Sequence, residues 1–217
     1  MREPVGTQRT QRTMSAVHRG DEGQIALPLV VFVLVVFAAA LAMFGFGEAS
    51  DTRGQAQKGA DAAALAAAAA ARDVVPLTIR TDPDSYYALT AGIEQVIQLG
   101  VGPAKGCAEA FGWAARNRTS TTCRYQGRGR FHTQATSRPS AERGLVADAE
   151  ATADSHLPTC TVQIVVDTFG DRHATFTCVP GPGGGHGTAI AYYLNEQYVS
   201  SSPDPVWKAL FRVRLVE

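Results

Sequence analysis

The chain has 217 residues, 45% of them hydrophobic, and its 20 lysines and arginines equal its 20 aspartates and glutamates. A net charge of zero creates no overall field that would attract nucleic acid, so we expect no nucleic-acid partner. Once a polar N-terminal tail and an apolar segment are set aside, the remaining length suits one compact domain of ordinary size.

Residues 1–23 are polar and show no periodic apolar pattern, which predicts a disordered tail. More arginines precede the following apolar segment than basic residues follow it closely. By the positive-inside rule, this bias predicts a cytoplasmic N-terminus and an extracytoplasmic C-terminal part, on a protein of the cell membrane.

The apolar segment from Ile25 to Gly47 contains no charged side chain. As a helix it would extend about 35 Å, enough to cross a hydrocarbon core of about 30 Å. We therefore predict a single transmembrane helix over residues 24–47, in contact with membrane lipid. A cleaved signal peptide is the alternative, because Ala40-Leu41-Ala42 has the form of a cleavage site. The length of the apolar run, which exceeds that of an ordinary signal core, favours an uncleaved anchor.

An alanine run, ADAAALAAAAAAR, follows a short polar segment and ends at Arg72. Alanine has the highest helix propensity, so residues 48–73 are predicted to form a helical stalk between the anchor and a domain at 74–217. Small side chains at helical spacing let a second helix approach closely, and they also permit an oligomer through the anchor. The predicted helix-contact face consists of Ala38, Ala42, Gly45, Ala49, Ala56, Ala60, Ala63 and Ala67.

Three features in this order form a recognisable pattern: Gly23-Gln24 before the apolar span, Arg53-Gly-Gln-Ala-Gln after it, and then the block that begins Ala60-Asp61-Ala-Ala-Ala-Leu65. Over residues 20–73 this order resembles the N-terminal module of the TadE/TadG-like family of Flp (tight-adherence) pilus-assembly proteins. The resemblance implies a membrane-anchored accessory protein. It also implies that the partners are other membrane proteins of a pilus-assembly or secretion apparatus.

The domain at 74–217 is predicted to be α+β, with helices packed on an antiparallel sheet. Prolines make residues 73–83 a linker. Apolar spacing and turn signals predict helices over 85–99, 104–116, 141–153 and 188–200, and strands over 119–125, 130–136, 159–167, 172–179 and 208–216. The helix over 104–116 would present Cys107 and Phe111 on one side.

All four cysteines follow the anchor, which favours disulfides over free thiols in an exported domain. In the predicted hairpin, pairing Cys160 with Cys178 aligns two alternating apolar rows, since Val162 then lies opposite Phe176. By elimination Cys107 pairs with Cys123. Structural zinc is disfavoured, because the chain contains no Cys-x-x-Cys pair.

The sequence lacks the Gly-Lys-Ser/Thr ending of a phosphate loop, a Gly-x-Ser-x-Gly elbow and a His-Glu-x-x-His helix. We therefore expect a non-enzymatic protein without cofactor or metal. An arginine-rich stretch suggests an alternative function, a surface module that binds an anionic cell-wall polymer. Its contacts would be Arg116, Arg118, Arg124, Arg128 and Arg130. The rival interpretation is that these charges only protect an exposed sheet edge.

Overall fold

The computed structural model describes residues 26–141 and 144–216. The predicted tail, residues 1–23, and the first two residues of the predicted transmembrane helix lie outside the described residues. The chain divides into two compact units between Phe46 and Gly47. The first unit holds the beginning of helix α1 (Ala26–Asp73), and the second holds the rest of α1 and the elements that follow it.

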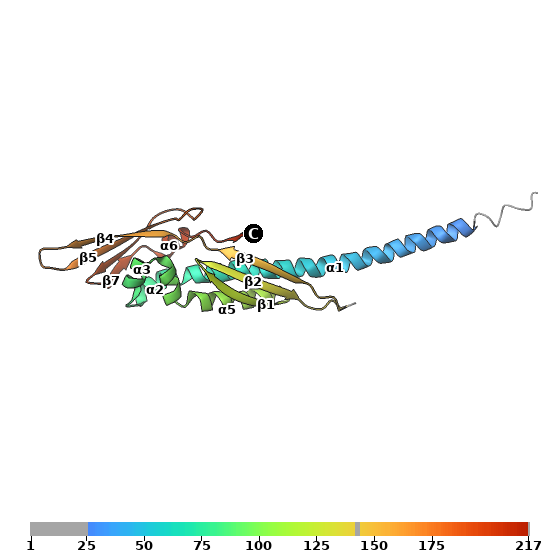
Figure 1. Ribbon diagram of the computed structural model, residues 1–217, viewed down its shortest axis with the longest axis horizontal. Helices are drawn as coiled ribbons and strands as arrows, with labels where there is room; N and C mark the ends of the chain where they lie inside the picture. The colour runs from blue at the N-terminus through green and yellow to red at the C-terminus, as the bar shows by residue number, and fades with distance from the viewer. Residues whose placement is uncertain (1–25, 142–143, 217) are drawn as a thin grey trace, which may run out of the picture. The chain divides into compact units, whose positions relative to one another are not determined.

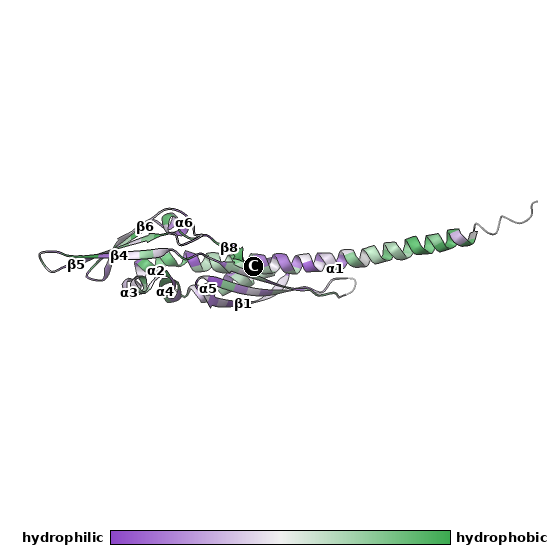
Figure 2. Ribbon diagram, turned by 45° about the horizontal axis from the view of Figure 1, so that its top comes forward, coloured by the Kyte–Doolittle hydropathy of each residue, from purple (hydrophilic) through white to green (hydrophobic). Residues whose placement is uncertain are grey.

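In the first unit α1 is apolar, and its side chains are exposed. Phe32 and Phe37 are 67% and 64% exposed, and hydrophobic residues line this part of the helix (Figure 2). Among the described helices, α1 alone is long and apolar enough to cross a membrane, judged by its length and composition. Such a surface is unfavourable in water and favourable in hydrocarbon. The predicted long apolar N-terminal helix is confirmed.

In the second unit α1 turns an alanine face toward the interior of the domain. Four alanines at steps of three or four residues are fully buried: Ala56, Ala60, Ala63 and Ala67. The Thr133 hydroxyl donates a hydrogen bond to the Ala60 carbonyl oxygen at 2.9 Å. A β-carbon added to Gly106 would lie only 2.7 Å from the Ala67 carbonyl oxygen. A strand and a second helix therefore approach the backbone of α1 closely.

The prediction that these four alanines contact a partner helix is wrong, because the chain's own elements cover them. The physical reason lies in the methyl side chains, which allow close approach by any neighbour, including one from the same chain. Residues 48–73, predicted to form a stalk, contribute these alanines to the buried interior of the second unit.

The first sheet packs over this part of α1. Its antiparallel strands lie in the order β1 (Thr119–Gly127), β2 (Arg130–Ser137), β3 (Asp148–Asp154) and β8 (Arg214–Val216) (Figure 1). Alternate residues of β2, among them Phe131 and Ala135, are buried, while Gln134 is exposed, as expected for a sheet with one solvated face.

Helix α5 (Gly102–Arg116) is linked to the first sheet by the disulfide between Cys107 and Cys123, which confirms the predicted pair. Its buried residues are small: Gly102, Gly106, Ala110 and Ala114. Phe111, which sequence spacing placed beside Cys107, is 50% exposed instead. A large residue does not fit on the buried side of α5, because the backbone of α1 lies too close.

The second sheet consists of β4 (Thr159–Val166), β5 (Arg172–Val179), β6 (Ala189–Leu194) and β7 (Gln197–Ser201), antiparallel and in that order. Three short helices, α2 (Val75–Thr81), α3 (Ser85–Ala91) and α4 (Ile93–Leu99), belong to the same unit. The Tyr86 ring of α3 packs edge-on against the rings of Phe176 and Tyr193, with 5.6 Å between centroids in each pair. Such pairs add about 0.5–1.5 kcal/mol to the gain from burial.

The predicted hairpin register is confirmed. Cys160 pairs with Cys178, Val162 with Phe176 and Ile164 with Ala174, and a disulfide joins the two cysteines. The alternation and the cysteine spacing are independent signals, and here they agree.

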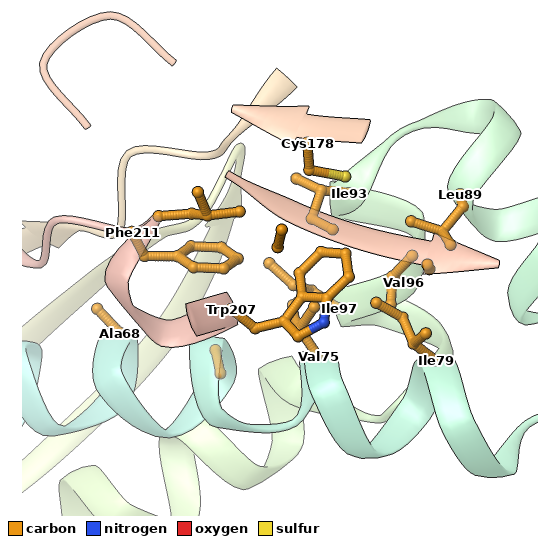
Figure 3. Packing of buried hydrophobic residues seen from close by; sticks show 14 of the residues in the cluster. Ala68, Val75, Ile79, Leu89, Ile93, Val96, Ile97, Cys178, Trp207 and Phe211 are labelled. Atoms are coloured by element: carbon orange, nitrogen blue, oxygen red, sulfur yellow. The ribbon is translucent and has the colours of Figure 1, made fainter. Parts of the chain in front are cut away.

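The core of the second unit extends from the alanines of α1 to the second sheet. Helix α6 (Asp204–Ala209) places Trp207 in it, fully buried. The indole lies above Val75 and beside Phe211, and Ile97 and Cys178 belong to the same cluster (Figure 3). The fold class, α+β with two disulfides, matches the prediction, with two antiparallel sheets in place of one.

Several predicted elements are corrected by the structure. Residues 141–153 contain most of strand β3 in place of a helix, and residues 188–200 contain β6 and most of β7. The linker at 73–83 contains α2, and the helix predicted over 85–99 is divided at Gly92 into α3 and α4. The strand predicted over 208–216 is reduced to β8, after the end of α6.

Alkaline pH is expected to destabilise the second unit through its buried tyrosines. Burial raises the pKa of Tyr193 from 10.0 to about 12, against the opposing effect of its hydrogen bond with Ser85. The folded state thus disfavours the phenolate, so this contribution to stability is complete below pH 10 and is lost as the pH rises toward 12. The urea concentration at the unfolding midpoint should fall as the pH rises across this interval, and it should fall less in Tyr193→Phe than in the parent. If the midpoint fell equally with pH in both proteins, Tyr193 would not be the residue responsible.

Candidate interaction surfaces

An open groove runs between α1 and α5 on the surface of the second unit, with a volume of about 680 Å³. Its lining is mostly apolar and comes from two faces that are far apart in sequence. The end of α1 and the residue after it contribute Ala62, Leu65, Ala66, Ala69, Ala70, Asp73 and Val74. Helix α5 contributes Lys105, Glu109 and Trp113.

The shape of the groove follows from side-chain size. On α1, the alanines that are not buried under the sheet form a nearly flat floor. Leu65 is the largest apolar side chain that α1 contributes to this floor. On α5, Lys105, Glu109 and Trp113 follow at four-residue steps and so share one face. The Arg116 guanidinium lies over the Trp113 ring, 4.7 Å from its centroid, and this cation–π contact favours one position of the exposed indole.

The charges at the groove are of two kinds. Asp73 is paired with Arg72 at 2.9 Å and with Lys208 at 3.4 Å. Lys105 and Glu109 have no ion pair within the described ranges, and both are exposed. Among the described residues that line the groove, Lys105 and Glu109 therefore present a cation and an anion without an ion-pair partner, a helical turn apart and beside an apolar floor.

The other half of the predicted helix-contact face lies in the exposed part of α1. Ala38, Ala42 and Ala49 are exposed. Gly45 lies in the same helix, and its exposure is outside the described part of the structure. None of the described residues covers the three alanines, and their contact with a partner helix stays a prediction.

The five arginines of the predicted polyanion site do not form one patch. Arg116 and Arg118 precede β1, whereas Arg128 and Arg130 lie at the hairpin that ends it, roughly 30 Å away at about 3.3 Å per residue. Arg124 projects from the strand between them. Arg130 is also paired with Asp154 at 3.1 Å. This spacing does not favour a compact anion site.

One polar cluster has the residue types of a catalytic site but a structural function. The His173 imidazole contacts the Tyr192 hydroxyl and lies 3.2 Å from an oxygen of Asp167. The hydrogen bond with His173 lowers the pKa of Asp167. Asp167 also accepts backbone N–H bonds from Phe169 and Asp171, so its carboxylate fixes the turn between β4 and β5. Within the described ranges, no group of three or more acidic, histidine or cysteine side chains is placed to hold a metal ion.

The groove was missed in the sequence because it combines two distant segments. A weak signal exists in the four-residue spacing of Lys105, Glu109 and Trp113, but it does not show which helix lies opposite. The alanine run gave a stronger signal and was assigned the wrong face. The alanines available to a partner are those of the groove floor, such as Ala66 and Ala70.

Comparison with known proteins gives one match. Residues 23–70 match the model of a family described as Flp pilus-assembly, TadE/G-like. No curated protein and no solved structure matches the chain. The match covers about a fifth of the chain: the apolar helix and nearly all of the alanine run. It confirms the resemblance of the N-terminal module and supports a pilus-assembly component with a membrane anchor.

Proposed function

We propose that this chain is a non-enzymatic, membrane-anchored component of a pilus-assembly or secretion apparatus, which acts by holding other proteins. The observation that carries the proposal is the family match over residues 23–70. The matched residues include the candidate membrane helix and the alanines of the groove floor. The match therefore links anchoring with a surface that is suited to protein contact.

The groove is the proposed site of contact between the second unit and a partner. Two helices side by side leave a furrow into which a third helix can pack, with its apolar face down and its polar face to solvent. The alanine floor allows that helix to approach closely, and Trp113 provides the large aromatic surface typical of binding hot spots. Lys105 and Glu109 would select a partner that carries opposite charges one turn apart.

The anchor contributes a second proposed contact within the membrane. Ala38, Ala42, Gly45 and Ala49 have the small-residue spacing that favours helix association in lipid. The disulfides favour an extracytoplasmic second unit, because such bonds persist in oxidising compartments. The partners would thus be other membrane proteins of the apparatus, with contacts in the bilayer and outside it.

Filling the groove is expected to abolish the contact without unfolding the domain. In Ala66→Phe, the ring would occupy the floor at an incompletely buried position. With a photoreactive residue at Ala108, an exposed α5 position that does not line the groove, crosslinking of the full-length chain to a membrane protein of the apparatus should fall about tenfold or more, the effect of losing a well-packed contact.

The matched control is Lys58→Phe, a substitution at an exposed α1 position that does not line the groove. It should crosslink and unfold like the parent. If Ala66→Phe also crosslinks and assembles like the parent, the groove is not the contact site. Circular dichroism of both variants separates lost binding from lost folding.

A further inference from the structure

Strand β4 forms one edge of the second sheet, and its side chains are unusually apolar for an edge. No charged residue occurs in its eight positions, Thr159–Val166. Val162, Ile164 and Val166 are 41%, 44% and 59% exposed, although they belong to the same row as Cys160, which faces the buried Cys178. The chain therefore leaves a row of β-branched side chains uncovered.

The backbone of the same residues is also unpaired. In an antiparallel pair, residues directly opposite alternate between hydrogen-bonded pairs with Cα atoms about 5.5 Å apart and non-hydrogen-bonded pairs about 4.5 Å apart. The Cα atoms of Cys160 and Cys178 are 4.0 Å apart, which identifies a non-hydrogen-bonded pair. By alternation, Val162, Ile164 and Val166 direct their N–H and C=O groups away from β5.

The other sheet edges are protected in the ways that natural proteins use. Strand β1 carries Arg124, and β8 has only three residues, one of which is Arg214. Strand β7 has five residues, and a register shift interrupts its pairing beside Tyr193. Strand β4 has none of these devices. At its end, the turn to β5 exposes 92% of Phe169.

We infer that the β4 edge binds an extended segment of another protein of the assembly, which joins the second sheet as a fifth strand. The outward N–H and C=O groups would supply the hydrogen bonds, and Val162 and Ile164 would supply the apolar contacts. Strand β4 carries no charge that could pair with a charge on the bound segment. A charged residue in the paired part of that segment would therefore lose its hydration without compensation. The segment is therefore uncharged over the paired length, with apolar residues at alternate positions. This surface is independent of the groove between α1 and α5.

A second copy of the chain does not fit this edge when both copies are anchored in one membrane. Two identical edges that pair in the antiparallel sense are related by a two-fold axis along the sheet normal, which reverses every direction in the sheet plane. Strand β4 and residues 47–73 of α1 run in the same general direction in both views of the domain (Figure 1, Figure 2). The two-fold axis would thus point the Gly47 ends of the two copies in opposite directions.

The test uses the full-length chain in phospholipid nanodiscs and a synthetic probe. The probe is a peptide of alternating threonine and valine, matched in length to β4, with a lysine tail for solubility. We expect it to slow amide hydrogen exchange at Val162, Ile164 and Val166. The amides of Gln163 and Val165 already point toward β5 and should not change.

Two pairs of controls isolate the backbone contribution. N-methylation of the probe along one edge should abolish the slowing, whereas N-methylation along the other edge should leave it intact. In the protein, Ile164→Pro removes one outward N–H and should weaken probe binding about tenfold or more, while Ile164→Val retains both that N–H and a β-branched apolar side chain and should bind like the parent.

Three outcomes would overturn the inference. The first is that the probe slows no amides, or slows them without alternation along β4. The second is that both N-methylated probes bind equally well. The third is a concentration-dependent dimer that protects the β4 amides without any probe, which would make a second copy the occupant. Ala66→Phe should leave the probe effect unchanged, so failure here is distinguishable from failure of the groove proposal.

Discussion

Replacing Trp207 with alanine is expected to lower the free energy of unfolding of the second unit by about 3–5 kcal/mol. The indole is fully buried, and it fills the space above Val75 and beside Phe211 (Figure 3). Its removal forfeits the transfer free energy of the ring and leaves a cavity, which neighbours on separate helices close only in part.

The control is the chain's other tryptophan. Trp113 is 42% exposed at the rim of the groove, so Trp113→Ala should change the unfolding midpoint little while it weakens groove binding. Urea unfolding of the full-length chain in mild detergent, followed by far-ultraviolet circular dichroism, measures both variants without relying on tryptophan fluorescence. Similar midpoints for Trp207→Ala and the parent would show that α6 is not part of the cooperative core.

The hairpin of β4 and β5 was predictable in detail because two signals agreed. Alternation fixes which residues share a face, and a slip by one residue would put the buried row in solvent. The cysteines then select one register from those that alternation allows. The structure pairs Val162 with Phe176 as this logic requires.

The hairpin of β6 and β7 was predicted as a helix because Ile190, Tyr193 and Leu194 have helical spacing. The structure forms a tight turn at Asn195 and Glu196, which both have positive φ angles of 49° and 68°. Two-residue hairpin turns with positive φ at both positions usually have glycine second, as in Asn-Gly. Here glutamate occupies that position, so the sequence lacks the usual turn motif. The aromatic and β-branched residues around the turn were the remaining evidence for strands.

Strand β3 was missed for a related reason. Its sequence alternates strictly between polar residues and alanine, in the order Asp-Ala-Glu-Ala-Thr-Ala-Asp. Alanine favours helices by intrinsic propensity, but sheet partners on both sides override that preference. Pairing with the preceding strand β2 and with the distant strand β8 supplies those partners.

The alanine run illustrates a limit of sequence patterns. Alanines occupy nearly every position from Ala62 to Ala71, so no periodicity distinguishes the face that the domain covers from the face that it leaves open. Only the position of the sheet decides this, and the sheet is built from residues that begin at Thr119, far beyond the end of the run. The groove depends on the same decision, which is why its location could not be predicted.

Gly106→Ala should test that arrangement with a single methyl group. The added carbon would lie 2.7 Å from the Ala67 carbonyl oxygen and 2.7 Å from a ring carbon of Phe131. A backbone atom cannot rotate away, so α1 and α5 must separate, with a penalty near the upper end of the usual 1–3 kcal/mol for overpacking. Helix propensity returns about 1 kcal/mol. We expect a net loss of about 2 kcal/mol in the urea assay.

Gly112→Ala is the matched control, because it adds the same methyl group to the same helix where no atom lies within 4 Å. It should gain about 0.5–1 kcal/mol from propensity alone, so the two variants should differ by about 3 kcal/mol. Gly106→Ala should also weaken crosslinking from Ala108, since it displaces α5 from α1 without changing any residue that lines the groove. Equal stability of the two variants would mean that α5 does not pack on α1 at Ala67, and the groove would then lack the wall on which partner binding depends.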